Sequence, residues 1–243
     1  MKKNDLIAIL SVSLFLIPFF IFDCVYQSYI DFNAQHGFIM SFIKFALLAT
    51  FGEMIGLRIK TGHYNQQGFG VIPRAIVWGF LGLTIKAAFI IFATGAPNIL
   101  KYLGFTDIAT AMSGSLSLTQ LLVAFTISVT LNTIYAPILM TVHKITDMHI
   151  MKNGGTVSGL FKRIEFGQLM VELDWKTQWN FIFKKTIPLF WIPAHTITFL
   201  LPSDAQILFA ALLGIALGII LSISSLAADK NNAADNVAKE GSA

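Results

Sequence analysis

Six long runs of apolar residues divide this chain, and more polar segments separate them. A helix needs about 20 apolar residues to cross the hydrocarbon core of a bilayer, and each run is close to that length. The pattern therefore predicts an all-α transmembrane bundle of about six helices in a single domain, 1–228. The predicted helices cover residues 6–22, 38–57, 75–94, 116–142, 181–201 and 205–226.

Three segments near or between these runs need separate interpretation. The first run follows Lys2 and Lys3 as a signal peptide would, but no small-residue cleavage site follows it, so we expect a retained helix. The long connection 143–180 alternates apolar and charged residues over part of its length, which fits a helix lying at the membrane interface. Residues 229–243 are rich in Ala, Asn, Asp and Lys, and are predicted to be disordered.

Lysine and arginine fall almost entirely in alternate connections. Twelve of them belong to one side of the membrane, and only Lys101 belongs to the other. Cytoplasmic loops of membrane proteins carry an excess of these two residues. The distribution therefore predicts that both termini face the cytoplasm.

Composition supports a membrane protein and narrows its partners. The chain is 55% hydrophobic and 12% charged, whereas roughly a quarter of the residues in soluble domains are charged. We therefore expect the lipid bilayer as its partner. The net charge of +4 comes from dispersed loop residues and not from a basic face with aromatic side chains, which disfavours nucleic acid.

Motifs for enzyme chemistry are scarce in the sequence. Cys24 is the only cysteine, so neither an internal disulfide nor a cluster of thiolate ligands can form. The sequence has no carboxylate pair inside a predicted helix, no His-x-x-x-His and no phosphate-binding loop. We therefore predict neither a metal nor a cofactor, and an enzyme is disfavoured.

Ionisable residues within predicted helices are the first candidates for a site, because charged groups are costly in lipid. We add three threonines that share one face of the fourth helix. One hypothesis is that these groups line a polar path for a solute. The alternative is that the lysines extend toward the head groups while the other side chains join helices by hydrogen bonds. The candidates are Lys44, Lys86, His195, Thr126, Thr130 and Thr133.

Other intramembrane residues have simpler interpretations. Glu53 lies near the predicted cytoplasmic end of its helix, at a depth similar to that of four basic residues, and is expected to form an ion pair there. Small residues suit close packing of helices, within one protomer or at the seam of a homo-oligomer. The four basic residues at the depth of Glu53 are Arg58, Arg74, Lys184 and Lys185. The small residues expected at helix contacts are Gly79, Gly82, Gly214 and Gly218.

Two segments resemble the Mpv-seventeen and peroxisomal membrane protein family, over less than half of the chain. The closing signature of that family is matched in order by Trp191, Phe199, Pro202 and the pair Leu221-Ser222, with His195, Thr198 and Gln206 in place of its Gln, Asn and Arg. Arg74 followed by Gly79-Phe-Leu-Gly82 is similar to its Gly-x-x-Gly-Pro element, with Leu83 in place of the proline.

The resemblance implies a small multispanning membrane protein, because members of this family are proposed to be weakly selective channels for small solutes. The family is usually drawn with four crossings, two fewer than the number predicted for this chain. The resemblance also places Lys86 and His195 at polar positions of its motifs, which ranks them above Lys44 as site residues.

The resulting prediction is a small-solute channel or facilitator in a bacterial inner (plasma) membrane, with an organellar membrane as the alternative. A non-catalytic membrane scaffold or assembly factor is the second candidate function. A membrane enzyme acting on lipid-like substrates is the third, and it would need ionisable groups clustered at one depth near an interface.

Overall fold

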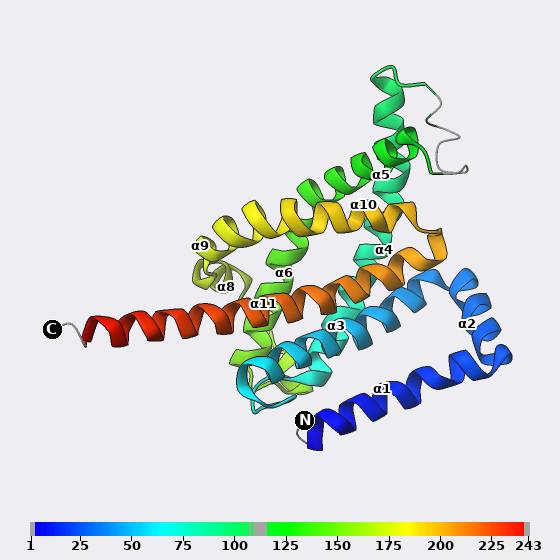
Figure 1. Ribbon diagram of the computed structural model, residues 1–243. Helices are drawn as coiled ribbons and strands as arrows, with labels where there is room; N and C mark the ends of the chain where they lie inside the picture. The colour runs from blue at the N-terminus through cyan, green and yellow to red at the C-terminus, as the bar shows by residue number, and fades with distance from the viewer. Residues whose placement is uncertain (1–2, 107, 109–115, 241–243) are drawn as a thin grey trace. The chain divides into compact units, whose positions relative to one another are not determined.

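The computed structural model describes residues 3–106, 108 and 116–240 (Figure 1). Every regular element in this part of the chain is a helix, which confirms the predicted all-α class. By its internal contacts the chain divides into two compact units, Met1–Met40 and Ser41–Ala243.

Among the described residues, five helical stretches are long and apolar enough to cross a membrane, and the protein is therefore an α-helical membrane protein. The fifth predicted crossing, 181–201, is helical up to Leu200 but divided between η3 (Gln178–Trp191) and α10 (Ile192–Leu200). The number of crossings and the orientation remain predictions. The five stretches are α1 (Lys3–Ile21), α3 (Gly37–Thr61), α4 (Val71–Tyr102), Leu118–Lys152 and the first part of α11, Ser203–Ile220.

The first unit contains α1, α2 (Asp23–Gln35) and the start of α3. Phe22 separates the first two helices with extended backbone angles, φ −113° and ψ 105°. The rings of Phe19 and Tyr29 then meet edge to face, with their centroids 5.7 Å apart. This contact between aromatic rings joins α1 to α2.

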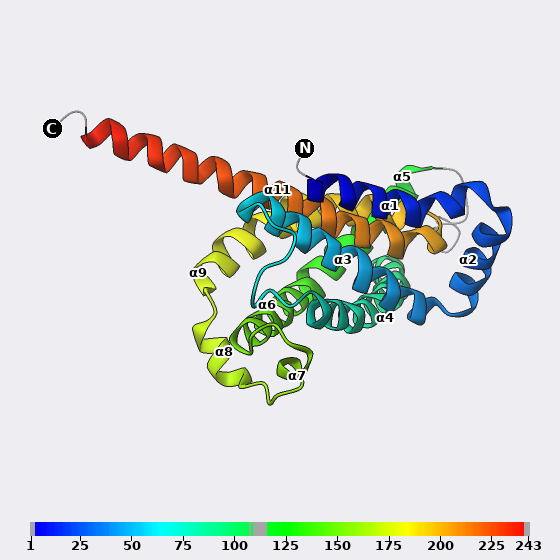
Figure 2. The same ribbon diagram turned by 90° about the horizontal axis from the view of Figure 1, so that it is seen from below.

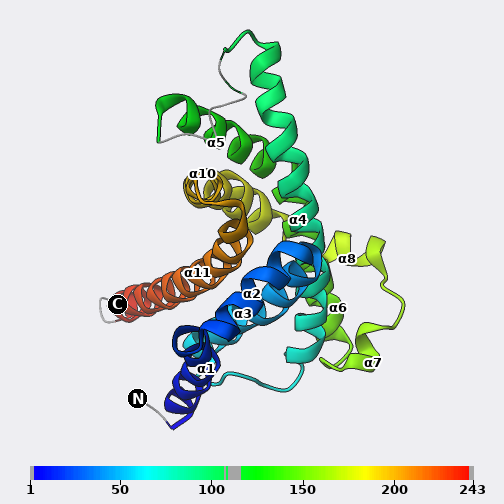
Figure 3. The ribbon, with the colours of Figure 1, turned by 90° about the vertical axis from the view of Figure 1, so that its right-hand side faces the viewer.

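The core of the second unit lies where α4, α5 (Leu118–Thr130), α10 and α11 (Ser203–Glu240) meet. Val123, Ile127 and Phe199 are almost completely buried in it. Helix α5 packs on both α4 and α10 (Figure 3). The Ser128 hydroxyl donates a hydrogen bond of 2.7 Å to the Ile192 carbonyl, which joins α5 to the start of α10.

Two stretches of π-helix interrupt the helices of this unit, and they contact each other. Segment η2 (Leu131–Tyr135) joins α5 to α6 (Ala136–Lys152), and η3 precedes α10. Pro137 follows η2 and Pro188 lies within η3, and each favours a wider turn just before it, because proline lacks an N–H and its ring clashes with the carbonyl four residues earlier. Single π turns in α-helices are frequent at functional sites.

The fourth predicted crossing is longer than expected. It was predicted to end at residue 142, but α6 continues to Lys152. The added residues keep a helical period, since Ile145, His149 and Ile150 are buried, so the helix is amphipathic where the chain becomes polar. The rest of the predicted loop forms three short helices that lead to η3 (Figure 2), namely α7 (Val157–Leu160), α8 (Phe166–Glu172) and α9 (Trp175–Thr177).

The last helix also exceeds its predicted end. Helix α11 continues through Glu240, which is beyond residue 226 and includes most of the segment 229–243 that we predicted to be disordered. Residues 241–243 lie outside the described part of the chain. The segment has too few apolar residues to form a packed core, which is why it was predicted to be disordered. Its alanines nevertheless favour a helix, because alanine is the strongest helix former and a helix does not require hydrophobic residues.

Two of the four predicted packing glycines, Gly79 and Gly82, lie at close contacts between helices, and Gly218 lies at an ordinary van der Waals contact. A Cβ atom at Gly82 would meet the Ser41 carbonyl oxygen and the Phe45 Cβ at 2.8 Å, and one at Gly79 would meet the Phe42 ring at 2.5 Å. Gly218 lies 3.4 Å from the Gly52 carbonyl by the same measure. Helix α3 therefore approaches α4 and α11 closely. No atom lies within 4 Å of a Cβ at Gly214, within the described residues.

Candidate functional site

A cavity of about 500 Å³ lies among α3, α4, the η2–α6 stretch, η3–α10 and α11. Most of its lining residues are apolar. Arg74 and Phe89 both line it, and they are separated by roughly 22 Å along α4 at 1.5 Å per residue. The cavity is therefore elongated, and its length approaches the roughly 30 Å of the hydrocarbon core.

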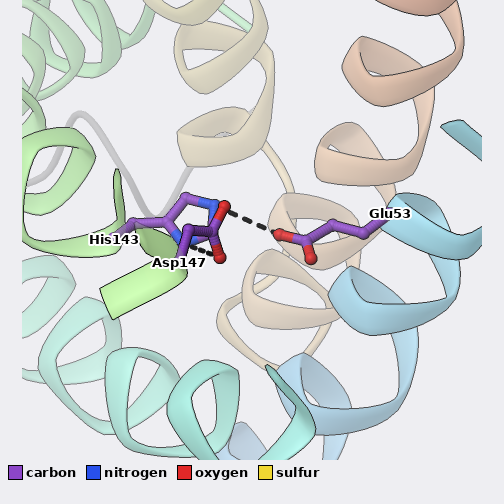
Figure 4. Close-up of side chains that lie close together, drawn as sticks. All are labelled: Glu53, His143 and Asp147. Carbon is purple, nitrogen blue, oxygen red and sulfur yellow. Dashed lines mark ion pairs between the residues drawn. The ribbon is translucent and has the colours of Figure 1, made fainter. Parts of the chain in front are cut away.

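Five side chains from three helices form a polar cluster at one end of this cavity. The Arg74 guanidinium donates to Glu53 at 2.5 Å and to Asp147 at 2.6 Å. Trp78 Nε1 donates to the other Glu53 oxygen at 2.9 Å. His143 lies between the two carboxylates, 3.2 Å from Glu53 and 3.8 Å from Asp147 (Figure 4). We call Glu53, Arg74, Trp78, His143 and Asp147 the polar cluster.

The polar cluster satisfies most of its own charges and hydrogen-bonding groups. Arg74 is 6% exposed, and its Nε donates to the Phe69 carbonyl at 2.8 Å. Its guanidinium also lies 4.4 Å from the centroid of the Phe69 ring, a cation–π geometry. One guanidinium thus contacts both carboxylates and a backbone carbonyl.

Local helix geometry explains how the polar cluster forms. Arg74 and Trp78 are four residues apart on α4, and His143 and Asp147 are four residues apart on α6, so each pair projects from one face of its helix. Glu53 completes the cluster from α3. Arg74 lies in the first turn of α4, which by the predicted orientation is the cytoplasmic end.

The opposite end of the cavity contains Phe89, Trp191 and His195. His195 packs against both rings, with its centroid 5.7 Å from that of Phe89 and 5.1 Å from that of Trp191. Its Nδ1 lies 3.0 Å from the side-chain nitrogen of Asn132. This end therefore has aromatic walls and polar nitrogen atoms but lacks the paired charges of the polar cluster.

The structure separates the six candidates for a polar path, all of which lie in its described part. His195 lines the cavity, and the other five do not. Lys44 is buried within electrostatic range of Lys86 and Asp204. The hydroxyls of the threonines donate to carbonyls of their own helix. These threonines are Thr126, Thr130 and Thr133. A polar path through all six residues stays a prediction.

Glu53 is ion-paired with Arg74, one of the four basic residues that lie at its predicted depth. The sequence interpretation missed His143 and Asp147 as site residues, because it placed them in a loop. Their spacing of four, with Ile145 and Ile150 on the buried face, is the signal of an amphipathic helix that would have placed both residues on the continuation of the fourth crossing.

Glu53, His143 and Asp147 also meet a distance criterion for a metal site, since their ligand atoms lie within 4.8 Å of one another. Carboxylate oxygen and imidazole nitrogen are common ligands of zinc. However, Arg74 contacts an oxygen of each carboxylate. A divalent cation would have to compete with this guanidinium, so the donor set fits a buried ion-pair network better than a metal centre.

Comparisons with protein-family models, with curated proteins and with solved structures found no match. The resemblance to the Mpv-seventeen and peroxisomal membrane protein family is therefore a proposal that depends on the quoted residues. In the structure, Trp191 and His195 of those residues line the cavity, and Phe199 belongs to the core.

Proposed function

We propose that this protein binds a lipid-like molecule, mostly apolar and with limited polarity, in the cavity among α3, α4, α6, η3 and α11. The observation that carries the proposal is the elongated shape of the cavity together with its mostly apolar lining. A pore for small polar solutes needs polar groups along its length, whereas an extended apolar chain is complementary to these walls.

The polar cluster supports a binding role more than catalysis. Its ionisable groups gather at one depth near an interface, as an enzyme acting on lipid-like substrates would require. Its two carboxylates and its guanidinium are nevertheless engaged with one another, so these three groups are not positioned as a free acid or base. We propose that the polar cluster closes one end of the cavity and ties α3, α4 and α6 together.

A small-solute facilitator remains the second candidate function, and one observation favours it. His195, which the sequence singled out for a polar path, lines the cavity, and the family resemblance implies the same activity. Liposomes containing the purified protein would then release a small anion faster than empty liposomes. Replacing Gly214 with tryptophan should block this release, whereas a lipid-binding protein should show no release in either form.

Filling the cavity tests the lipid-binding proposal directly. Gly214 lines the cavity, and no atom of the described residues lies within 4 Å of a Cβ placed there. We expect Gly214→Trp to reduce the lipid retained by the purified protein at least about tenfold, which corresponds to about 1.4 kcal/mol of binding free energy. Native mass spectrometry would count and identify the retained lipid.

Gly95→Trp is the matched control, because Gly95 also has open space around it but does not line the cavity. This variant should retain lipid as the unmodified protein does. Equal retention by both tryptophan variants would contradict the proposal, since the lipid would then be bound at the outer surface of the bundle.

A further inference from the structure

An unsatisfied hydrogen-bond donor lies at the end of the cavity opposite the polar cluster. Trp191 lines the cavity and is only 8% exposed, and its buried Nε1 has no hydrogen-bond partner among the described residues. Leaving a buried donor unpaired costs about 1 to 3 kcal/mol, and most such groups in proteins are paired. The indole N–H therefore lacks a partner within the described part of the protein, on a side chain that borders the cavity.

His195 provides a second donor beside Trp191. The Asn132 amide nitrogen lies 2.8 Å from the Ser128 carbonyl and 3.0 Å from His195 Nδ1, while the Asn132 oxygen lies farther from Nδ1, at 3.2 Å. An amide nitrogen has two hydrogens, so it can donate to both acceptors. We assign Nδ1 as the acceptor on this basis, which places the histidine proton on Nε2.

We infer that Trp191 and His195 together bind an uncharged carbonyl oxygen of the lipid-like ligand, as in a quinone with an apolar tail. A carbonyl oxygen accepts two hydrogen bonds, and this end of the cavity offers two N–H groups. Phe89 and Trp191 also line this end and pack against the His195 ring, so the imidazole is held in place beside the ligand. This inference rests on the proposed lipid-binding function and specifies the class of ligand.

The position of the ligand's polar group follows from the contrast between the two ends. At the polar cluster, Arg74 is already bonded to Glu53, Asp147 and the Phe69 carbonyl. Among the described residues, Trp191 Nε1 at the opposite end has no hydrogen-bond partner, and His143 Nδ1 in the polar cluster also lacks one. The two ends differ in charge, because a carbonyl oxygen at the polar cluster would lie near the Glu53 and Asp147 carboxylates, whereas beside Trp191 and His195 it meets two uncharged donors. The tail of the ligand would then run along the apolar walls toward the polar cluster.

The test compares two probes that differ in oxygen content. One is a benzoquinone with a ten-carbon alkyl chain, and the other is the matching alkylbenzene, which has no acceptor. Calorimetric titration of the detergent-solubilised, lipid-stripped protein should show quinone binding that Trp191→Phe and His195→Phe each weaken about fivefold, the loss of one neutral hydrogen bond. Alkylbenzene binding should be weaker and similar in all forms, which also shows that the variants fold.

Trp179→Phe is the control for the loss of an indole from the same helix, since Trp179 is exposed and does not line the cavity. It should bind the quinone as the unmodified protein does. Equal quinone affinity in Trp191→Phe, or alkylbenzene binding as tight as that of the quinone, would overturn the donor pair but leave lipid binding intact. Failure of both probes to bind the unmodified protein would overturn the proposed function as well.

Discussion

Replacing Arg74 with methionine is expected to lower the free energy of unfolding by about 3 to 5 kcal/mol, the usual cost of removing one partner from a buried ion pair. Arg74 is 6% exposed and contacts both Glu53 and Asp147. Without it, two carboxylates would lie close together at one end of a mostly apolar cavity and repel. Far-ultraviolet circular dichroism during titration with a denaturing detergent would measure the loss.

Two further variants identify the origin of this loss. Adding Glu53→Gln and Asp147→Asn to the Arg74 variant should restore at least half of the stability, because both unpaired charges are then removed. Lys144→Met is the matched control, since Lys144 is an exposed basic residue beside the cavity, and it should change stability little. If the triple variant were as unstable as Arg74→Met, packing and not charge would explain the result.

Replacing Gly82 with alanine is expected to lower the free energy of unfolding by about 1 to 3 kcal/mol, although alanine is the better helix former. The added methyl group would lie 2.8 Å from the Ser41 carbonyl oxygen and from the Phe45 Cβ. Neither atom can move without its backbone. The new contact would therefore push α3 away from α4 and weaken the hydrogen bond from the Ser41 hydroxyl to the Gly82 carbonyl.

Two other glycines calibrate this effect in the same detergent titration. Gly79→Ala should cost less, because its neighbour is the Phe42 ring, which can rotate. Gly214→Ala should stabilise the protein by up to about 1 kcal/mol through helix propensity, since the space around it is open. A neutral or stabilising Gly82→Ala would show that the contact between α3 and α4 is looser than the structure indicates.

The fold class was predictable because hydrophobicity and length determine which segments can be helices in lipid. The predicted start of α3 and the predicted starts of the fourth and last crossings lie within two residues of the observed helix starts. The helix ends were less predictable. Hydrophobicity falls where α6 becomes amphipathic, so His143 and Asp147 were assigned to a loop. The buried residues Ile145 and Ile150 show that the helical period continues there.

The candidate site was predictable only in part, because it depends on how helices pack. Depth in the membrane indicated an ion pair for Glu53, and Arg74 was among the basic residues at that depth. The sequence could not place Asp147 beside them, since that contact joins residues 73 positions apart. Nor could spacing along one helix reveal that the hydroxyls of Thr126 and Thr130 donate to carbonyls of their own helix.

The π-helical turns of η3 determine which way the following side chains face. A π turn closes its hydrogen bond over five residues in place of four, so each residue beyond η3 is rotated from its place on a regular α-helix. His195 lies four residues after the end of η3 and lines the cavity. Removing the irregularity would preserve every residue of the chain but turn this histidine toward a different neighbour, so the site depends on backbone winding as much as on side-chain identity.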